Sequence, residues 1–120
     1  MHELSIALSL VDAACEKAAA LGEVRVEAVY VRLGPLSGVV KDALSFCFDA
    51  AARGSSIDGA HLEIEDVPTV VFCARCSSER ELASPSRLRC PVCGEPTPDV
   101  IAGRELELTA LEVSDRATHC

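Results

Sequence analysis

The sequence predicts an α+β fold, with a small three-stranded sheet, two helices and an inserted module that carries two C-x-x-C knuckles. Two observations lead to this class. Helix-like and strand-like patterns alternate along the first half of the chain, and the second half is interrupted by a segment rich in proline and cysteine. The 120 residues suffice for one domain with a small appendage. We expect an α/β domain over residues 1–67 and 104–113, the inserted module over 68–103, and a flexible tail over 114–120.

Two amphipathic helices are expected in the α/β domain. Over residues 4–21, apolar positions recur at steps of three and four, and Gly22 follows as a stop. A second helix is expected over residues 37–53, with Ser37 as its N-cap and Gly54 as its stop. The residues predicted to face the core are Leu4, Leu8, Val11, Cys15 and Ala18 in the first helix, and Leu36, Val40, Ala43, Cys47 and Ala50 in the second.

Three strands complete the predicted domain. Residues 24–33 are rich in β-branched side chains, and their apolar positions change face part-way, which indicates a strand that is covered on both sides or bulged. Residues 61–67 alternate apolar and polar positions, with Glu63 and Glu65 on a solvated face. A last strand is expected over residues 104–113.

The charge balance disfavours several classes of partner. Eleven Lys and Arg against nineteen Asp and Glu give a formal net charge of −8, and aromatic residues make up only 3%. A protein that neutralises phosphates and stacks on bases needs the opposite composition, so we expect no nucleic-acid partner. No apolar run approaches the ~18 residues of a membrane span, and no basic residue precedes Lys17, so we expect neither a membrane partner nor a secretory signal.

The cysteines give the strongest chemical signal. Cys73 and Cys76 form one C-x-x-C pair and Cys90 and Cys93 another, and two such turns brought together form a closed site of four thiolates. Zinc is favoured because it is tetrahedral and redox-inert, which predicts a structural zinc in a zinc-ribbon-like module. A rubredoxin-type iron site is the competitor, and redox thiols fit less well because a catalytic pair is usually single. An odd total of seven cysteines favours a cytoplasmic location over an oxidising compartment.

The amino terminus offers a second, weaker set of ligands. The amine of Met1, with the amide and imidazole nitrogens of His2, can wrap a metal in adjoining chelate rings, and Glu3 can add a carboxylate or its amide nitrogen. Nitrogen donors of this kind suit nickel(II) or copper(II). Taken alone, a histidine at position two is usually a solvated residue on a frayed end.

These features together closely resemble the HypA/HybF family of nickel metallochaperones. The resemblance is carried by Met1-His2-Glu3-Leu4-Ser5-Ile6-Ala7, by the four knuckle cysteines, by Leu33-Gly34-Pro35-Leu36-Ser37-Gly38-Val39 and by Leu62-Glu63-Ile64-Glu65-Asp66-Val67-Pro68. It implies a protein that delivers nickel to the large-subunit precursor of NiFe-hydrogenase together with a HypB-type GTPase. Some relatives also serve urease. By this resemblance, His2, Glu3 and the amine of Met1 bind nickel, and Cys73, Cys76, Cys90 and Cys93 bind structural zinc.

The remaining candidates receive ordinary structural interpretations. We expect Cys15 and Cys47 in the core, because free cysteine behaves as a small hydrophobe, and His61 in solvent. His119 and Cys120 are expected in the tail, with weak binding of a soft metal as the alternative. No nucleophile motif or open metal position points to an enzyme. The competing function is a zinc-ribbon adaptor for protein interaction without nickel transport, and a homodimer stays open for either.

Overall fold

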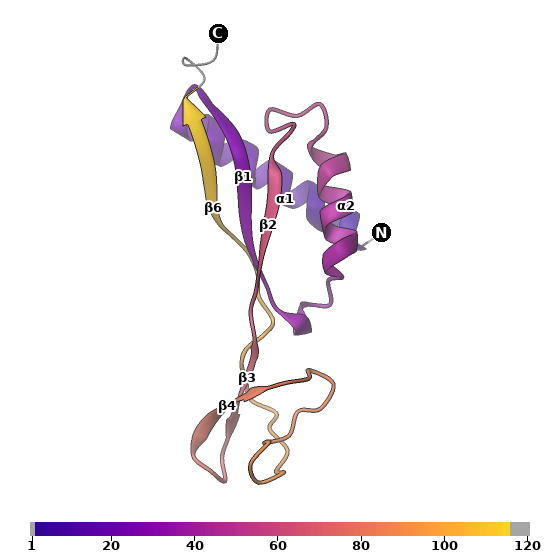
Figure 1. The fold of residues 1–120 in the computed structure, drawn as a ribbon, viewed down its shortest axis with the longest axis vertical. Coiled ribbons are helices and arrows are strands. Elements are labelled where there is room, and N and C mark those ends of the chain that lie inside the picture. Colours follow the sequence, from indigo (N-terminus) through magenta and orange to yellow (C-terminus); the bar gives the residue numbers. More distant parts are fainter. Residues whose placement is uncertain (1, 116–120) are drawn as a thin grey trace. The chain divides into compact units, whose positions relative to one another are not determined.

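The structure is a computed structural model that describes residues 2–115. It contains two three-stranded sheets, one with strand order β2-β1-β6 and one with order β4-β3-β5, and it is an α+β fold as predicted. The elements in chain order are α1 (His2–Leu21), β1 (Val24–Leu33), the 3₁₀ turn η1 (Pro35–Ser37), α2 (Lys41–Ala52), β2 (His61–Asp66), β3 (Thr69–Cys73), β4 (Ser78–Leu82), β5 (Val100–Ala102) and β6 (Leu106–Asp115) (Figure 1). Within the described residues, no helix is both long and apolar enough to cross a membrane.

The chain divides into two compact units. Within the described residues, unit 1 contains residues 2–31, 39–65 and 107–115, and unit 2 contains residues 32–38 and 66–106. The segment 32–38, which the sequence analysis assigned to the first domain, belongs to unit 2 because its backbone is bonded there. The hydrogen bonds run from Gly34 N to Glu105 O (2.8 Å), from Leu36 N to Gly103 O (2.7 Å) and from Val67 N to Leu33 O (2.9 Å).

The same bonds define the directions of the strands around β1. Val67 follows β2 and bonds to Leu33 at the end of β1, so β2 runs parallel to β1. Glu105 precedes β6 and bonds to Gly34 just after β1, so β6 runs antiparallel to it (Figure 1). The strand predicted over residues 24–33 is confirmed as β1. Its predicted change of face is also confirmed, because the buried positions are Val26 and Ala28 followed by Val29, Val31 and Leu33.

Helix α1 begins at His2, before the predicted start, and its buried face shares only Val11 and Ala18 with the predicted one. The predicted positions Leu4 and Leu8 are 39% and 48% exposed, and Cys15 is only half-buried. Both sides of this helix carry apolar residues, so the helical period alone could not select the buried side. The side chains that are buried are Ala7, Leu10, Val11, Ala14 and Ala18.

Helix α2 starts later than predicted, at Lys41 rather than at residue 37. Ser37 ends η1 instead of capping the helix, and Gly38 has a left-handed backbone (φ 81°) that interrupts the helical path. The helical phase therefore restarts after Val40, which is 60% exposed and not buried as predicted. The other predicted core positions divide: Cys47 is buried, Leu36 and Ala43 are half-buried, and Ala50 is exposed. The buried residues of α2 are Leu44, Cys47, Phe48 and Ala52.

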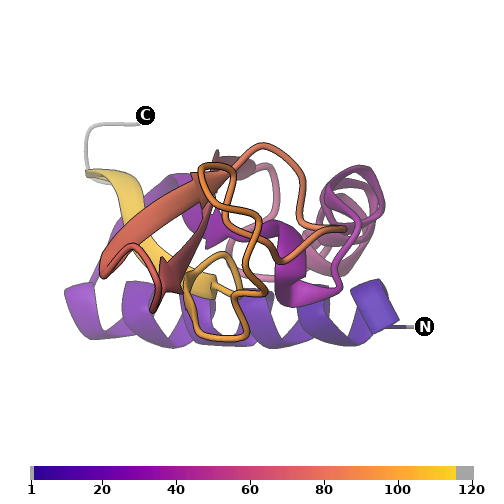
Figure 2. The ribbon, with the colours of Figure 1, turned by 90° about the horizontal axis from the view of Figure 1, so that it is seen from below.

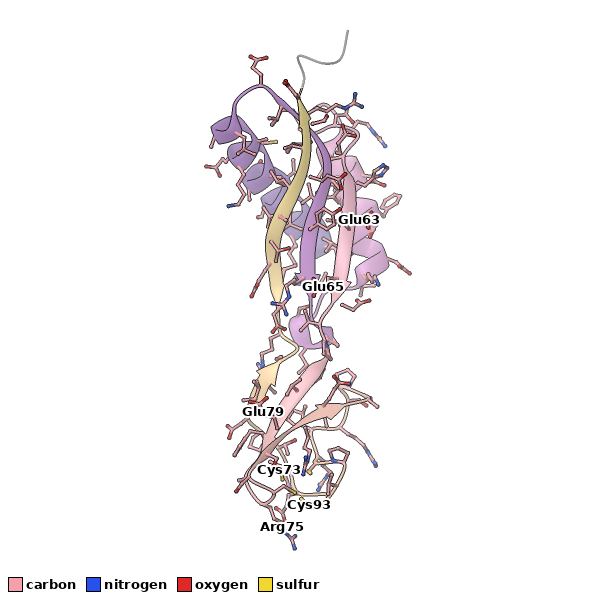
Figure 3. All side chains as sticks on the ribbon, turned by 60° about the vertical axis from the view of Figure 1, so that its left-hand side comes forward. Glu63, Glu65, Cys73, Arg75, Glu79 and Cys93 are labelled. Carbon is pink, nitrogen blue, oxygen red and sulfur yellow. The ribbon has the colours of Figure 1, made fainter. Side chains whose placement is uncertain are left out.

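The two helices pack against each other in unit 1. Figure 2 shows α2 against the amino-terminal part of α1, and the backbone N–H of Val40 donates to Glu3 Oε2 at 3.2 Å. Strand β2 lies over His61–Asp66, with Glu63 and Glu65 exposed as predicted (Figure 3). Strand β6 extends through Ser114 and Asp115, two residues that the sequence analysis placed in the tail.

The only tyrosine of the chain provides a test of this sheet. Tyr30 Oη donates to Glu112 Oε1 at 2.8 Å, and this hydrogen bond and the carboxylate charge raise the pKa of Tyr30. The neutral phenol is therefore favoured in the folded chain, and this advantage is lost as the pH rises through the folded pKa. In Glu112→Gln, the midpoint of the tyrosine absorbance titration should fall towards about 10. An unchanged midpoint would contradict this contact, and Glu23→Gln serves as the control.

Unit 2 is built on β3, which pairs antiparallel with β4 and β5. The turn between β3 and β4 holds the first C-x-x-C pair, and the loop between β4 and β5 holds the second. These three strands belong to the predicted zinc-ribbon-like module, although no strand was assigned in this segment from the sequence. Its core is small, with Val71, Cys73, Leu82 and Cys90 among its buried side chains.

Candidate metal centre

The first knuckle forms where β3 turns into β4. Cys73 is the last residue of β3 and pairs with Ser78, the first residue of β4. Ser77 takes a left-handed backbone conformation (φ 52°), which reverses the chain tightly. The backbone N–H of Cys76 points at Cys73 Sγ at 3.4 Å. The turn therefore presents two sulfurs and a backbone donor on one side.

The second knuckle is held by backbone bonds around Cys90. Cys90 N donates to Glu95 O and Gly94 N donates to Cys90 O, each at 2.9 Å. Gly94 has φ 80°, a conformation that glycine adopts without strain, so the chain can close directly behind Cys93. The N–H of Val92 points at Cys90 Sγ at 3.4 Å. The two knuckles thus repeat one local design, in which a backbone N–H supports a sulfur.

The four sulfurs come together as the spacing predicts. The Sγ atoms of Cys73, Cys76, Cys90 and Cys93 all lie within 4.8 Å of one another. Across the two knuckles, Cys73 Sγ is 3.5 Å from Cys93 Sγ, and Cys76 Sγ is 3.9 Å from Cys90 Sγ (Figure 3). A tetrahedral ion with bonds of about 2.3 Å to four thiolates requires sulfurs about 3.8 Å apart. The cluster fits one tetrahedral metal ion.

The proton affinities of the thiols also fit a metal site. Burial raises the pKa of Cys90, but the N–H groups of Cys93 and Val92 and the neighbouring thiols outweigh it and lower the pKa to about 6. For Cys93, the N–H of Glu95 lowers the pKa. Burial and the three other cysteines raise it by more, so the net effect is a pKa raised to about 12. The cluster releases its first proton easily and its last one reluctantly, because negative charges accumulate. A bound cation removes that obstacle.

The predicted nickel ligands that the structure describes, His2 and Glu3, lie in the first turn of α1. His2 is the first residue of α1 and is exposed, whereas Met1 lies outside the described residues. The Glu3 carboxylate accepts the hydrogen bond from Val40 N, which lowers the pKa of Glu3. This carboxylate therefore sits at the start of α2, where the helix dipole also favours negative charge.

The chain is similar in sequence to known proteins over nearly its whole length. The sequence model of the family described as "Hydrogenase/urease nickel incorporation, metallochaperone, hypA" matches residues 1–113. The chain belongs to the HypA family. The hydrogenase maturation factor HypA of Chloroflexus aurantiacus is 52% identical over 112 residues, which are 93% of this chain and 98% of that protein. That of Streptomyces avermitilis is 42% identical over 120 residues, with 99% of this chain and 92% of that protein covered.

A solved structure of the HypA family resembles the fold. The solution structure of the Ni metallochaperone HypA from Helicobacter pylori superimposes with a TM-score of 0.65 at 26% identity. The match covers 95% of this chain and 98% of that one. The matched region therefore includes residues of both units of this chain.

The other candidate residues of this HypA-family chain belong to unit 1 or lie outside the described residues. Cys47 is buried in α2 as predicted, Cys15 is half-buried in α1, and His61 is exposed on β2. His119 and Cys120 lie outside the described residues. Arg80 on β4 was not singled out from the sequence; its Nε atom is buried and has no hydrogen-bond partner among the described residues. The burial of Arg80 follows from the pairing register of β3 with β4, which places it opposite the buried Val71, and that register is not evident from the sequence.

Proposed function

We propose that this chain is a nickel metallochaperone for hydrogenase maturation that binds nickel(II) at its amino terminus and zinc at its four-cysteine cluster. The observation that carries the proposal is the family match over residues 1–113, which begins with Met1-His2-Glu3. His2 is the primary nickel ligand, with the amine of Met1 and with Glu3 as an auxiliary ligand. The exposure of His2 on the first turn of α1 supports release of the metal to a partner over permanent storage.

The four cysteines are proposed as structural zinc ligands. Their sulfur separations support a tetrahedral ion, and four protein ligands leave no open position for a substrate. We therefore propose that the chain is not an enzyme. The reduced thiols that zinc requires support a cytoplasmic setting. The same argument separates the two metals, because soft thiolates suit zinc, whereas amine and imidazole nitrogens suit nickel.

The partners are proposed from the family's role. A HypB-type GTPase and the large-subunit precursor of NiFe-hydrogenase are the expected partners, with urease maturation as an additional role. A chain that delivers metal binds it at an accessible position and loses it when its ligands are protonated. Protons compete with the metal for the amine and imidazole nitrogens, so nickel affinity should fall as the solution becomes more acidic.

The test is a nickel(II) titration of untagged, zinc-loaded protein near neutral pH. We expect one equivalent bound by the wild type, and loss of binding in His2→Ala and in a variant with two residues added before Met1. Zinc content should not change in either variant. His61→Ala is the matched control, since His61 is also an exposed histidine of unit 1, and it should bind nickel as the wild type does.

Equal nickel binding by the wild type and His2→Ala would contradict the amino-terminal site. Tight binding by the extended variant would do the same, because the extension converts the amine of Met1 into a peptide nitrogen and moves the free amine away from His2. In either case the competing function, a zinc-ribbon adaptor for protein interaction, would be favoured.

A further inference from the structure

The outward face of α2 carries the most exposed large apolar side chain within residues 2–115. Phe46 is 77% exposed, whereas Leu44 and Phe48, two positions before and after it, are fully buried. Two positions correspond to about 200° around a helix, so Phe46 projects away from the core of unit 1. The chain has only three phenylalanines, one tyrosine and no tryptophan. One of its few aromatic rings is therefore left in water, where its apolar surface is unfavourable.

Acidic side chains flank Phe46 on the same face of the helix. Residues three and four positions apart are neighbours on a helix surface, so Asp42 and Asp49 lie about one turn before and one turn after Phe46. Both are exposed. Neither forms an ion pair within the part of the chain that the structure describes. The outward face of α2 thus combines an apolar ring with two uncompensated carboxylates.

A hollow of about 350 Å³ continues this face at the carboxyl end of α2. It is lined by Asp49 and Arg53 from the helix, and by Asp58 and His61 from the loop that returns the chain to β2 (Figure 1). Asp58 Oδ2 accepts the backbone N–H of Gly54 at 2.9 Å, which ties the loop to the end of the helix. Arg53 forms no ion pair with either carboxylate among the described residues.

The electrostatics of the hollow favour an additional cation. With His61 neutral, two carboxylates and one guanidinium leave a formal charge of −1. The carboxyl end of a helix adds partial negative charge, which a basic side chain in the last turn commonly offsets. Helix α2 has no basic residue in its last turn. The ammonium of a lysine or the guanidinium of an arginine from another molecule would supply the missing charge.

We propose that the outward face of α2 is a docking surface for a basic amphipathic segment of a partner protein, which packs an apolar side chain on Phe46 and places a lysine or arginine in the hollow between Asp49 and Asp58. Complementary charge selects this partner, and it disfavours a second copy of the chain, whose net charge is also −8. The surface is separate from the proposed nickel ligands. Glu3 contacts Val40 at the amino end of α2, and twelve helical residues span about 18 Å.

The experiment measures the fluorescence anisotropy of a labelled amphipathic peptide, with leucines on one helical face and lysines on its flanks, against the full zinc-loaded chain. Phe46→Ala should weaken binding about 10-fold, because it removes the apolar anchor. The double variant Asp49→Asn with Asp58→Asn should weaken it to a similar extent and reduce its dependence on salt. Leu21→Ala and Asp12→Asn are the matched controls on α1. They also change an exposed apolar and an exposed acidic residue, and they should bind as the wild type does.

The inference is overturned if the wild type does not bind the peptide, if Phe46→Ala binds it as Leu21→Ala does, or if the double variant binds it as Asp12→Asn does. Equal binding of a peptide with glutamates in place of the lysines would overturn it as well. In sedimentation, self-association of the wild type that Phe46→Ala abolishes would assign the face to a second copy instead. Phe46→Ala should bind nickel(II) as the wild type does, so this inference and the proposed function can fail separately.

Discussion

Replacing Cys73 by serine should remove the metal and unfold unit 2, while unit 1 stays folded. Cys73 is fully buried at the end of β3, and its sulfur lies 3.5 Å from Cys93 Sγ and accepts the N–H of Cys76. A structural zinc contributes about 10–16 kcal/mol to a small module, more than the few apolar side chains of unit 2 can replace. Unit 1 has its own core around Leu44, Phe48 and the buried side of β1.

Amide hydrogen exchange is the measurement that separates the two units. Cys73→Ser, or removal of zinc by a chelator, should abolish protection over residues 66–106 and leave it over α1 and β1. Cys15→Ser is the control, since Cys15 is a half-buried cysteine of α1 away from the cluster, and it should keep both zinc and protection. Persistent protection of β3 in the Cys73→Ser chain would show that the module folds without its metal.

Gly34→Ala should cause the largest loss of stability among the glycine variants of unit 2. A Cβ atom at Gly34 would lie 2.1 Å from Gly103 O and 2.2 Å from Gly103 C. These are backbone atoms that cannot rotate away, and they belong to the segment bonded to Leu36 N. The backbone of Gly34 itself is extended (φ −96°), so the cost comes from crowding and not from its conformation. We expect a loss of about 3 kcal/mol or more in the free energy of unfolding.

Gly38→Ala provides the matched comparison. Gly38 lies in the same segment with φ 81°, and a Cβ there would meet nothing within 4 Å. Its cost should be limited to about 1–2 kcal/mol for the left-handed conformation. Denaturant midpoints measure both variants, followed by hydrogen exchange of the zinc-loaded chains or by the thiolate-to-cobalt absorbance of cobalt(II)-substituted chains. Equal midpoints would contradict the close approach of Gly34 to Gly103.

The sequence predicted the elements whose pattern is local. The β-branched run of β1 and its change of face needed no tertiary information, and the alternation of Leu62 and Ile64 sufficed for β2. Of the buried face of α1, only Val11 and Ala18 were predicted, since alanine and leucine line both sides of the helix. The start of α2 depended on the left-handed turn at Gly38, which the apolar spacing around it concealed.

The candidate metal centre, too, was predicted only where its geometry is local. The cysteine spacing alone predicted that the four sulfurs would meet, because each knuckle is a short local turn. Strands β3, β4 and β5 were not predicted. β3 reads TVVFC and β5 reads VIA, so both carried the β-branched signal of a strand, which was overlooked among the surrounding prolines and cysteines, whereas β4 reads SEREL and is polar. The burial of Arg80 could not be recognised either, because it depends on which residue of β3 this arginine pairs with.

The order β2-β1-β6 leaves the sheet of unit 1 with two edge strands, and their composition affects how copies of the chain meet. Unpaired backbone groups at a sheet edge can add a strand from another molecule and begin aggregation. Strand β2 reads HLEIED and β6 reads LELTALEVSD, so each contains three acidic residues and neither contains lysine or arginine. Edge-to-edge pairing of any two copies would bring carboxylates together. The acidity of these strands therefore keeps concentrated protein from assembling into extended sheets, and mild acid weakens that protection by neutralising the carboxylates.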